Sequence, residues 1–567
     1  MPEFRISGPP GTGKTTFIAN KLIPPAVDKY GIDKVMVTSF SRTAAKEIAS
    51  RQLPIPDVSV GTLHSLCYRA LGHPELVFKK LKDWNAAHPE FRIDERAASV
   101  SVDMATNVDL SQGGSLQGEQ LLAFLDKSRS KMLSIQRTST SLIRFAKLWT
   151  NFKQDTGTID FADMIELCLQ ERLGAPGDPD VIIVDEVQDL TPLQIALVRQ
   201  WGKNAKEYYM VGDDDQCIFA FSGASPTAYL KPDIDAKFKK VLDQSYRVPR
   251  AVHALASNIV SQISFREEKT YRPKEVEGNV RIMEKCNWKE PYAAVKDSIW
   301  RYKEGKSVMF LASCAYMLDP IKLYLMDNGV PFGNLYRPNR KDWNPLLSGM
   351  GENVQAIDLL TNFLGKGPDE NYWTIPQFVT WANYLSVGDS GLIRAKGKKV
   401  IEALNKAIDQ KQEGLFSARN VIDQVLSPAA IDAAMRRDVE WFCETLKADR
   451  QKTIKYPATV LKNFGLNGIK KAPYATLGTV HSVKGAEADV VYVFPDIPYA
   501  SFKNLWANGY HKANIDQWDE MYRLFYVAVT RAKEEVVLLQ PAAPQREVSK
   551  QMYFDMRKYL SEQKEAA

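Results

Sequence analysis

The stretch Gly8-Pro9-Pro10-Gly11-Thr12-Gly13-Lys14-Thr15 decides the fold of this chain. It follows a short strand candidate at Phe4–Ile6 and precedes a helical pattern at Thr16–Leu22. A strand, a glycine-rich loop and a helix in this order form an anion cradle, because loop N–H groups and the helix N-terminus point at one site. The alternative is a chance glycine-rich turn, which the flanking strand and helix disfavour. The stretch therefore predicts an α/β domain that holds a nucleoside triphosphate.

Each loop side chain has an expected task. The glycines let the backbone approach phosphate oxygens closely, Lys14 neutralises the β/γ charge, and Thr15 can hold Mg²⁺. The loop residues expected to contact the nucleotide are Gly8, Gly11, Gly13, Lys14, Thr15 and Thr16.

A carboxylate pair supplies the second half of a hydrolytic site. The apolar run Val181–Val184 leads directly into Asp185 and Glu186. A carboxylate delivered by a buried strand can hold Mg²⁺ through water, and the next carboxylate can orient or deprotonate an attacking water. A strand that ends in a solvated acidic turn is the alternative. Together with the phosphate loop, the pair predicts an NTPase.

Composition sets the broad class of protein. The 567 residues suggest three or four domains, at roughly 150 residues per domain. The net charge of +6 allows a nucleic-acid partner without requiring one. Six cysteines without Cys-x-x-Cys spacing favour neither zinc nor a disulfide framework, and no apolar run approaches the roughly 20 residues that span a bilayer. We expect a cytoplasmic protein with no membrane partner.

The coarse pattern along the chain is α/β. Short apolar runs predict buried parallel strands at Val35–Thr38, Val181–Val184, Tyr208–Val211, Val308–Leu311, Val490–Phe494 and Val536–Leu539. Residues 72–155 and 336–471 are instead mostly helical in pattern. We interpret them as insertions into two α/β domains.

Further stretches point to a family. In order along the chain, they resemble motifs Ia, Ib, II, III, IV, V and VI of superfamily 1 helicases of the UvrD/Rep/PcrA type: Thr38–Glu47, Gly61–Ser65, Asp185–Asp189, Val211–Ala224, Gln244–Arg247, Thr479–Glu487 and Tyr526–Lys533. The resemblance covers almost the whole chain.

This resemblance implies two RecA-like P-loop NTPase domains, 1A and 2A, each with a mainly helical insertion, 1B and 2B. The boundaries expected are 1–71 and 156–240 for 1A, 72–155 for 1B, 241–335 and 472–545 for 2A, 336–471 for 2B, and 546–567 for a C-terminal tail.

The resemblance also implies catalytic roles. Asp185 would support the metal, Glu186 would act as general base, and Gln216 would sense the γ-phosphate. Arg247 and Arg531 would reach the γ-phosphate from domain 2A, so that cleft closure neutralises the transferring phosphoryl group. The alternatives are a surface salt bridge for each arginine and a helix cap for Gln216.

The rest of the nucleotide site is implied in the same way. Tyr246 would stack on the base and Glu487 would contact the ribose, although Tyr246 could also be a core aromatic. Only Met1–Ser7 precede the phosphate loop, fewer residues than the glutamine motif that reads adenine in the family. The choice of base therefore stays open, with ATP and Mg²⁺ as the expected cofactors.

The resemblance implies that single-stranded and partial-duplex DNA are the partners. Aromatic faces stack on bases without reading sequence, at roughly 1–3 kcal/mol per base, and cations contact phosphates. Core packing for the aromatics and solvation for the cations are the alternatives. The residues of this chain in segments that contact single-stranded DNA in the resembling family are Phe40, Arg42, His64, Phe219, Phe221, His481 and Lys484.

The function that the resemblance implies is an ATP-dependent helicase that moves 3′→5′ on single strands, unwinds duplex DNA and serves DNA repair or replication. Phe221 and Ser222 stand where the family often has tryptophan and usually has arginine. This difference keeps open a translocase that strips proteins from DNA with little unwinding. A nucleotide-gated binding module is the third possibility.

Overall fold

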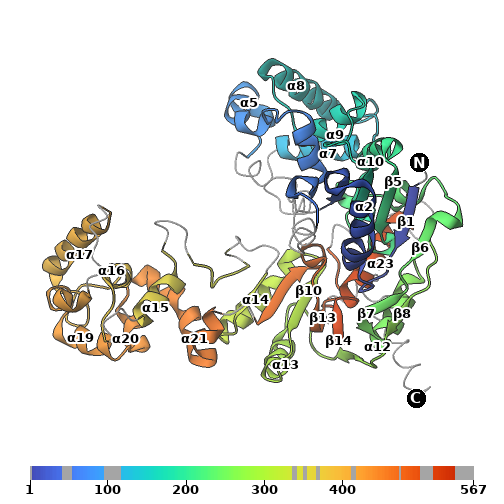
Figure 1. The fold of residues 1–567 in the computed structure, drawn as a ribbon. Helices are drawn as coiled ribbons and strands as arrows, with labels where there is room; N and C mark the ends of the chain where they lie inside the picture. The colour runs from blue at the N-terminus through green and yellow to red at the C-terminus, as the bar shows by residue number, and fades with distance from the viewer. Residues whose placement is uncertain are drawn as a thin grey trace. The chain divides into compact units, whose positions relative to one another are not determined.

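The structure is a computed structural model (Figure 1). It describes residues 3–40, 54–94, 117–334, 341, 343–348, 354–365, 371–409, 417–470, 474–498 and 515–542. The chain divides into two compact units. The first comprises Met1–Lys285, Leu311–Cys314 and Thr479–Ala567, and the second comprises Cys286–Phe310 and Ala315–Gly478.

A six-stranded parallel sheet organises the first unit. Its order is β3-β2-β4-β5-β1-β6, so consecutive strands in sequence are joined by crossovers. The strands are β1 (Glu3–Ser7), β2 (Val35–Ser39), β3 (Val60–Thr62), β4 (Val181–Asp185), β5 (Glu207–Gly212) and β6 (Lys239–Val241). The α/β prediction is confirmed, and the runs at Val35, Val181 and Tyr208 are strands.

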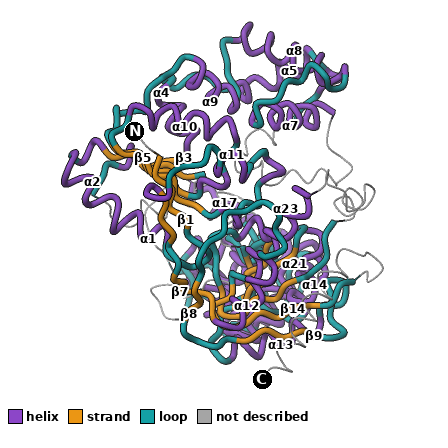
Figure 2. Tube along the Cα trace, turned by 90° about the vertical axis from the view of Figure 1, so that its right-hand side faces the viewer, coloured by secondary structure: helices purple, strands orange, loops and turns teal. Residues whose placement is uncertain are grey.

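Alternate residues of these strands pack on opposite faces of the sheet, as the two-residue period of a strand requires. Val37 and Ile183 pack against the helical segment that follows the phosphate loop. Met36 and Ile182 pack against helices on the other face. Figure 2 shows these helices on either side of the strands. They are α2 (Ile23–Tyr30) on one face, and α4 (Leu63–Ala70), α9 (Phe161–Gln170) and α10 (Pro192–Asn204) on the other.

The helix after the phosphate loop is longer than the pattern at Thr16–Leu22 predicts. α1 (Lys14–Phe17) passes through a π-helical turn, Ile18–Leu22, into α2, which ends at Tyr30. Pro24 and Pro25 occupy the first turn of α2. Proline is tolerated in a first turn because the N–H it lacks has no partner there, and the π turn supplies such a start inside a continuous helix.

The described part of segment 72–155 is mainly helical. Its elements include α5 (Leu81–Ala87), α7 (Gln117–Ser130) and α8 (Thr140–Thr156). Trp84 and Trp149 meet edge to face with ring centroids 4.8 Å apart, and Phe145 packs beside both. All three are fully buried, so this segment has an apolar core of its own.

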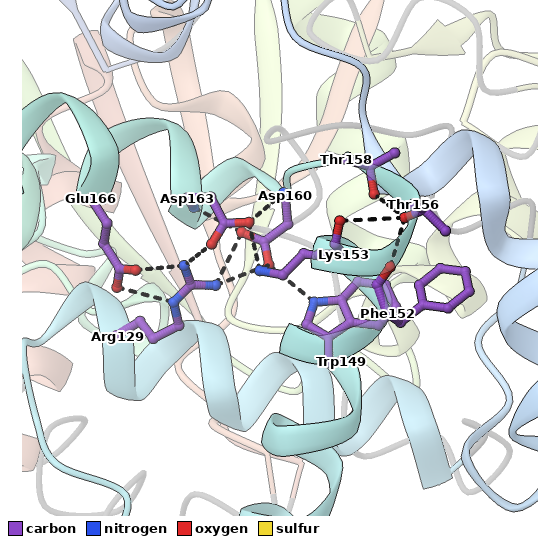
Figure 3. A network of polar contacts seen from close by, with 9 residues as sticks. All are labelled: Arg129, Trp149, Phe152, Lys153, Thr156, Thr158, Asp160, Asp163 and Glu166. Carbon is purple, nitrogen blue, oxygen red and sulfur yellow. Dashed lines mark hydrogen bonds and ion pairs between the residues drawn. The ribbon is translucent and has the colours of Figure 1, made fainter.

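A charged network joins α7, α8 and α9 (Figure 3). Arg129 on α7 donates to Asp160 at 2.9 Å and to Glu166 at 2.6 Å. Lys153 on α8 lies 2.5 Å from both Asp160 and Asp163. Asp160 and Asp163 also cap α9 reciprocally. Buried charges are stable only when paired and hydrogen-bonded, so the network fixes how these three helices pack.

Asp126, beside this network, provides a test of its electrostatics. Burial raises the pKa of Asp126 to about 8, and the Asp160 carboxylate adds to the effect. A raised carboxyl pKa contributes stability that is full below the unfolded-state pKa and is lost as pH rises through the folded-state pKa. Asp126→Asn is therefore expected to raise the free energy of unfolding at pH 8 by at least about 1 kcal/mol, the worth of one pKa unit.

The measurement is urea unfolding of Asp126→Asn and wild type at pH 4 and pH 8. The two proteins are expected to differ little at pH 4, where the carboxyl is protonated in the folded state and about half protonated in the unfolded state. An equal difference at both pH values would contradict the electrostatic origin of the effect.

The rest of the first unit is also α/β. β13, β14 and β9 run parallel in that order, and β7 pairs with β8. α12 and α23 pack against each other. The elements are β7 (Gln244–Pro249), α12 (Arg250–Val260), β8 (Arg272–Lys274), β9 (Asn279–Met283), β13 (Ala488–Val493), α23 (Ile515–Val529) and β14 (Ala532–Leu539).

The second unit is mostly helical in its described residues. Its strands β11 (Phe332–Gly333) and β12 (Ala475–Thr479) are parallel, and β10 (Val308–Ala312) runs across the division between the units. Phe363 and Phe442 stack with centroids 4.2 Å apart in the core of the helical region. The helices are α13 (Tyr292–Lys303), α14 (Asp319–Asp327), α15 (Ala356–Leu364), α16 (Ile375–Ala382), α17 (Arg394–Asp409), α18 (Ile422–Val425), α19 (Pro428–Met435), α20 (Val439–Thr445) and α21 (Ala448–Lys470).

None of the helices in the described ranges combines the length and the apolar character that crossing a membrane requires.

Candidate nucleotide site and aromatic cluster

The phosphate loop lies between the end of β1 and the start of α1. The Gly8 N–H donates to the Gly212 carbonyl at 2.9 Å, which ties the loop to the end of β5. Thr12 Oγ1 donates to the Pro9 carbonyl at 2.8 Å. Gly13 caps α1 in the left-handed region, with φ of 75°. The loop is thus held by its own backbone, and the first N–H groups of the helix face the same space.

Gly11 makes the closest approach between the loop and another element. Its φ is +74°, and a Cβ there would lie 2.5 Å from the Cβ of Arg247 on β7. The Tyr246 N–H donates to the Gly11 carbonyl at 2.8 Å, and Ser245 Oγ donates to the Pro10 carbonyl at 3.0 Å. Only glycine fits at position 11, because β7 lies so close to the loop. The loop and β7 together form one wall of the site.

Glu186 follows β4 with a left-handed backbone (φ 51°), which is uncommon for a residue with a side chain. Asp185 Oδ1 accepts the Glu186 N–H at 2.9 Å, which supports this turn. Burial raises the pKa of the Glu186 carboxyl, but the positive charges of Lys14 and Lys484 lower it. The net effect is a pKa below the ordinary value. Glu186 is therefore held as a carboxylate in a positive environment.

Gln188 belongs to the site, although the sequence analysis did not predict it as a site residue. Its Oε1 accepts the Asp213 N–H at 3.0 Å, and its Nε2 donates to Glu186 Oε2. A Cβ on Gly212 would lie 2.4 Å from Gln188 Oε1, so a side chain there would displace this amide. The amide links the ends of β4 and β5. Its only signal in sequence is a glutamine two residues after Glu186.

The Gln216 side chain links Asp213, its neighbour in sequence, to Arg531, which lies far along the chain. Its Nε2 donates to Asp213 Oδ2 at 2.7 Å, and its Oε1 accepts from Arg531 Nη2 at 3.4 Å. Arg531 is only 2% exposed, and its Nε donates to the Val527 carbonyl at 3.0 Å. Burial lowers the pKa of Arg531, and the neighbouring Arg247 lowers it further. The buried guanidinium is thus held at the cavity wall by backbone carbonyls and by Gln216.

These residues enclose a cavity of about 1110 Å³. Arg247 and Glu487 form an ion pair on its wall, with Nε 2.7 Å from Oε2. Tyr246 is 74% exposed, so its ring is free to stack and is not a core aromatic. The expected site residues that line the cavity are Gly11, Gly13, Lys14, Thr15, Thr16, Glu186, Gln216, Tyr246, Arg247, Lys484, Glu487 and Arg531.

The donor set beside the loop fits a magnesium ion. Thr15 lines the cavity, and Asp185, 1% exposed, ends the neighbouring strand β4. Ser39 pairs with Asp185 across β2 and β4, and its buried hydroxyl has no hydrogen-bond partner within the described part of the chain. Hydroxyl and carboxylate oxygens are the ligands that Mg²⁺ prefers.

An aromatic cluster lies beside the cavity. The Phe219 ring centroid is 5.1 Å from Phe40, 5.9 Å from Phe221 and 5.8 Å from His481. Phe221 is 39% exposed, whereas Phe219 is 5% exposed. Lys484 Nζ lies 5.3 Å from the Phe219 ring centroid. The cluster therefore combines three segments that the sequence associated with DNA.

The other expected DNA residues are Lys484, His64 and Arg42. Lys484 Nζ donates to Asp189 Oδ1 at 2.6 Å and to the Gln216 carbonyl at 2.7 Å, so it links the cavity to the cluster. His64 meets Phe161 edge to face at 6.1 Å, and burial lowers its pKa to about 4, which keeps the imidazole neutral at pH 7. Arg42 lies outside the described residues.

Comparison with known proteins agrees with this site. The UvrD/REP helicase N-terminal domain matches residues 3–237, and the UvrD-like helicase C-terminal domain matches residues 439–540. The chain belongs to the UvrD/REP helicase family. The prediction of this family is confirmed, and with it two RecA-like domains, to which the parallel sheets correspond.

Named relatives resemble this helicase along most of their length. A probable DNA helicase II homolog of Mycoplasma capricolum subsp. capricolum is 23% identical over 608 residues, which cover 94% of this chain and 81% of the relative. The ATP-dependent DNA helicase Rep of Buchnera aphidicola subsp. Baizongia pistaciae is 22% identical over 613 residues, covering 94% and 89%.

Proposed function

We propose that this helicase is an ATP-dependent DNA helicase that moves 3′→5′ along single strands and unwinds duplex DNA ahead of it. The observation that supports this most strongly is the cavity itself. It brings the phosphate loop of the N-terminal part together with Arg247, Glu487 and Arg531 from later parts of the chain. The relatives named as DNA helicases support DNA as the substrate, and the direction rests on the UvrD/Rep resemblance.

In this proposal the triphosphate lies over the phosphate loop, with Lys14 at its terminal phosphates and Tyr246 against its base. Thr15 and Asp185 would hold Mg²⁺, which when bound neutralises phosphate charge. Glu186, kept ionised by its cationic surroundings, orients the attacking water and accepts its proton. Arg247 and Arg531 neutralise the charge that develops on the transferred group.

Domain boundaries are part of the same proposal. The N-terminal match at residues 3–237 supports 1–240 as domain 1A with its insertion 1B, and we assign 241–335 and 472–545 to 2A. The mostly helical residues described between 354 and 470 support 336–471 as insertion 2B.

Coupling to DNA follows from Lys484. It contacts Asp189 and the Gln216 carbonyl on one side and the Phe219 ring on the other. A DNA strand would stack on Phe221, the exposed member of the aromatic cluster. Only the Phe219 and Lys484 side chains then separate it from Gln216, the expected γ-phosphate sensor. Base stacking on such a platform is tolerant of sequence, as a motor on DNA requires.

A translocase with little unwinding is the second candidate, and Ser222 favours it. Ser222 carries no charge, and its hydroxyl donates to the Phe219 carbonyl at 2.7 Å. This position therefore offers a DNA strand no cation. Weaker grip on DNA phosphates would reduce strand separation more than stepping, because separation works against base pairing.

The test is strand displacement on two partial duplexes, one with a 3′ single-stranded tail and one with a 5′ tail, with ATP hydrolysis followed in the same tubes. Unwinding of only the 3′-tailed duplex is expected. DNA-stimulated hydrolysis without unwinding of either duplex would favour the translocase. Unwinding of only the 5′-tailed duplex would refute the proposed direction.

A further inference from the structure

Three consecutive aspartates, Asp213, Asp214 and Asp215, lie buried at the end of β5, each at most 1% exposed. Their carboxylates lie within 4.8 Å of one another. The side chain of Lys269, itself 1% exposed, occupies the centre of this group. Its Nζ is 3.0 Å from Asp213 and 2.9 Å from Asp215, and it also contacts Asp214. The cluster is therefore a buried ion network around one ammonium group.

Lys269 belongs to the segment 264–271, which links α12 to β8. Asp519 on α23 accepts the N–H groups of Ser264 at 2.8 Å and Phe265 at 2.9 Å. Arg523, also on α23, donates to the Asp214 carbonyl at 3.0 Å. α23 ends two residues before Arg531, so the segment joins the turn at 213–216 to the helix that precedes this arginine.

The Asp213 carboxylate has a second task. Its Oδ1 accepts from Lys269 and from the Asp215 N–H at 3.3 Å, while its Oδ2 accepts from Gln216 Nε2 at 2.7 Å. A carboxylate can only accept, so the NH₂ end of the Gln216 amide must face it. The carbonyl end of that amide then faces Arg531, whose guanidinium can only donate.

We propose that Lys269 is a positioning residue for nucleotide hydrolysis: by fixing Asp213, it sets the Gln216 amide with its oxygen toward Arg531. This inference rests on the ATPase part of the proposed function. Burial lowers the pKa of Lys269, but the three carboxylates raise it well above its ordinary value, so the ammonium stays charged. Lys269 itself does not line the cavity and acts only through the line Lys269–Asp213–Gln216–Arg531.

The main test is a charge-balanced pair, Lys269→Met with Asp214→Asn, which removes one positive and one negative charge from the cluster. With Gln216 no longer held, kcat for DNA-stimulated ATP hydrolysis is expected to fall by about 10- to 100-fold, as for an active-site group displaced by ~1 Å. The KM for ATP is expected to change little, because the phosphate loop is untouched.

The matched control is Arg266→Met with Asp215→Asn. Arg266 forms a two-bond ion pair with Asp215, at 2.9 and 2.8 Å, so this pair also removes one charge of each sign. It removes the Asp215 carboxylate from the cluster but leaves Lys269 with its Asp213 and Asp214 partners, and so keeps the Lys269–Asp213 contact on which the proposal depends. The control is expected to keep the wild-type kcat, and an equal fall in both pairs would overturn the proposal.

Epistasis separates positioning from general stabilisation. In a Gln216→Ala background, the Lys269→Met/Asp214→Asn pair is expected to lower kcat no further, because its effect passes through Gln216. A structural role for Lys269 would lower kcat in both backgrounds by the same factor, which would overturn the proposal. So would a folded Lys269 pair that keeps the wild-type kcat.

Asp213→Asn tests the proposal if the Lys269→Met/Asp214→Asn variant does not fold. Lys269 keeps two of its partners in this variant, but an amide at 213 presents a donor either to Gln216 Nε2 or to Lys269. The kcat is expected to fall without a large change in KM, and wild-type kcat would overturn the proposal. Wild-type protein in the same assay separates the two ideas: if it does not hydrolyse ATP, the proposed function fails.

Discussion

Lys14→Ala is expected to reduce ATP hydrolysis at least about 10²- to 10³-fold, as loss of a single charge-stabilising donor does, while the protein stays folded. Lys14 Nζ lies 2.9 Å from the Gly8 carbonyl and lines the cavity, so its removal leaves the triphosphate charge uncompensated. Lys14 is not part of a hydrophobic core, so truncating it opens no buried void. Phosphate release with saturating single-stranded DNA measures the effect, and thermal unfolding reports the fold.

Lys29→Ala is the matched control for this variant. Lys29 lies on α2, which continues from the phosphate-loop helix, and its Nζ forms an exposed ion pair with Glu207 at 2.9 Å. Exposed pairs contribute little to stability, so Lys29→Ala should hydrolyse ATP like wild type. Normal turnover by Lys14→Ala would show that the phosphate loop does not carry the reaction.

The central strands of the first sheet were predictable from sequence because both of their faces are buried. β2 and β4 consist of apolar residues apart from their last positions, so each is visible as an uninterrupted run. The edge strand β6 was missed. Its residues Lys239–Val241 are exposed, and only pairing with β1 makes them a strand. β9, a half-exposed strand with an arginine at its centre, was missed for the same reason.

The length of the first helix could not be read from its sequence. Pro24 and Pro25 predict a stop after Leu22, because proline in a helix interior removes a hydrogen bond and clashes with the preceding turn. The π turn at Ile18–Leu22 removes that conflict. Burial of Ile18, Ile23 and Ala26 against the sheet stabilises the continued helix. Tertiary packing thus overrides the local signal.

The site residues that sequence could predict are those in contiguous signatures. Lys14 and Glu186 stand in stretches with a chemical logic of their own, and Arg531 stands in a motif that the family resemblance identifies. The structure brings all three to one cavity. Lys269 has no such stretch. Its importance depends on three aspartates more than 50 residues earlier, and on a fold that buries all four groups together. A lone lysine in sequence is indistinguishable from a solvated one.

Arg531→Ala is expected to bind ATP but to hydrolyse it about 10³- to 10⁵-fold more slowly, as loss of an arginine finger does. The guanidinium is buried at the cavity wall and contacts Gln216 Oε1 at 3.4 Å. It can therefore neutralise charge that develops on the phosphoryl group during its transfer. Binding of a fluorescent ATP analogue and single-turnover hydrolysis separate the two steps.

Arg531→Lys decides whether charge alone explains that loss. The arginine makes three contacts in different directions, to the Val527 carbonyl, the Ala486 carbonyl and Gln216, and a single ammonium cannot reproduce them. The lysine variant is therefore expected to fold, since it keeps most of the side-chain volume, and to remain slow. If Arg531→Lys restored most of the turnover, a point charge at this wall would suffice, and the amide orientation of Gln216 would have no catalytic consequence. If Arg531→Ala kept wild-type turnover, Arg247 alone would neutralise the transferred phosphoryl group, and its ion pair with Glu487 would have to open for it to act.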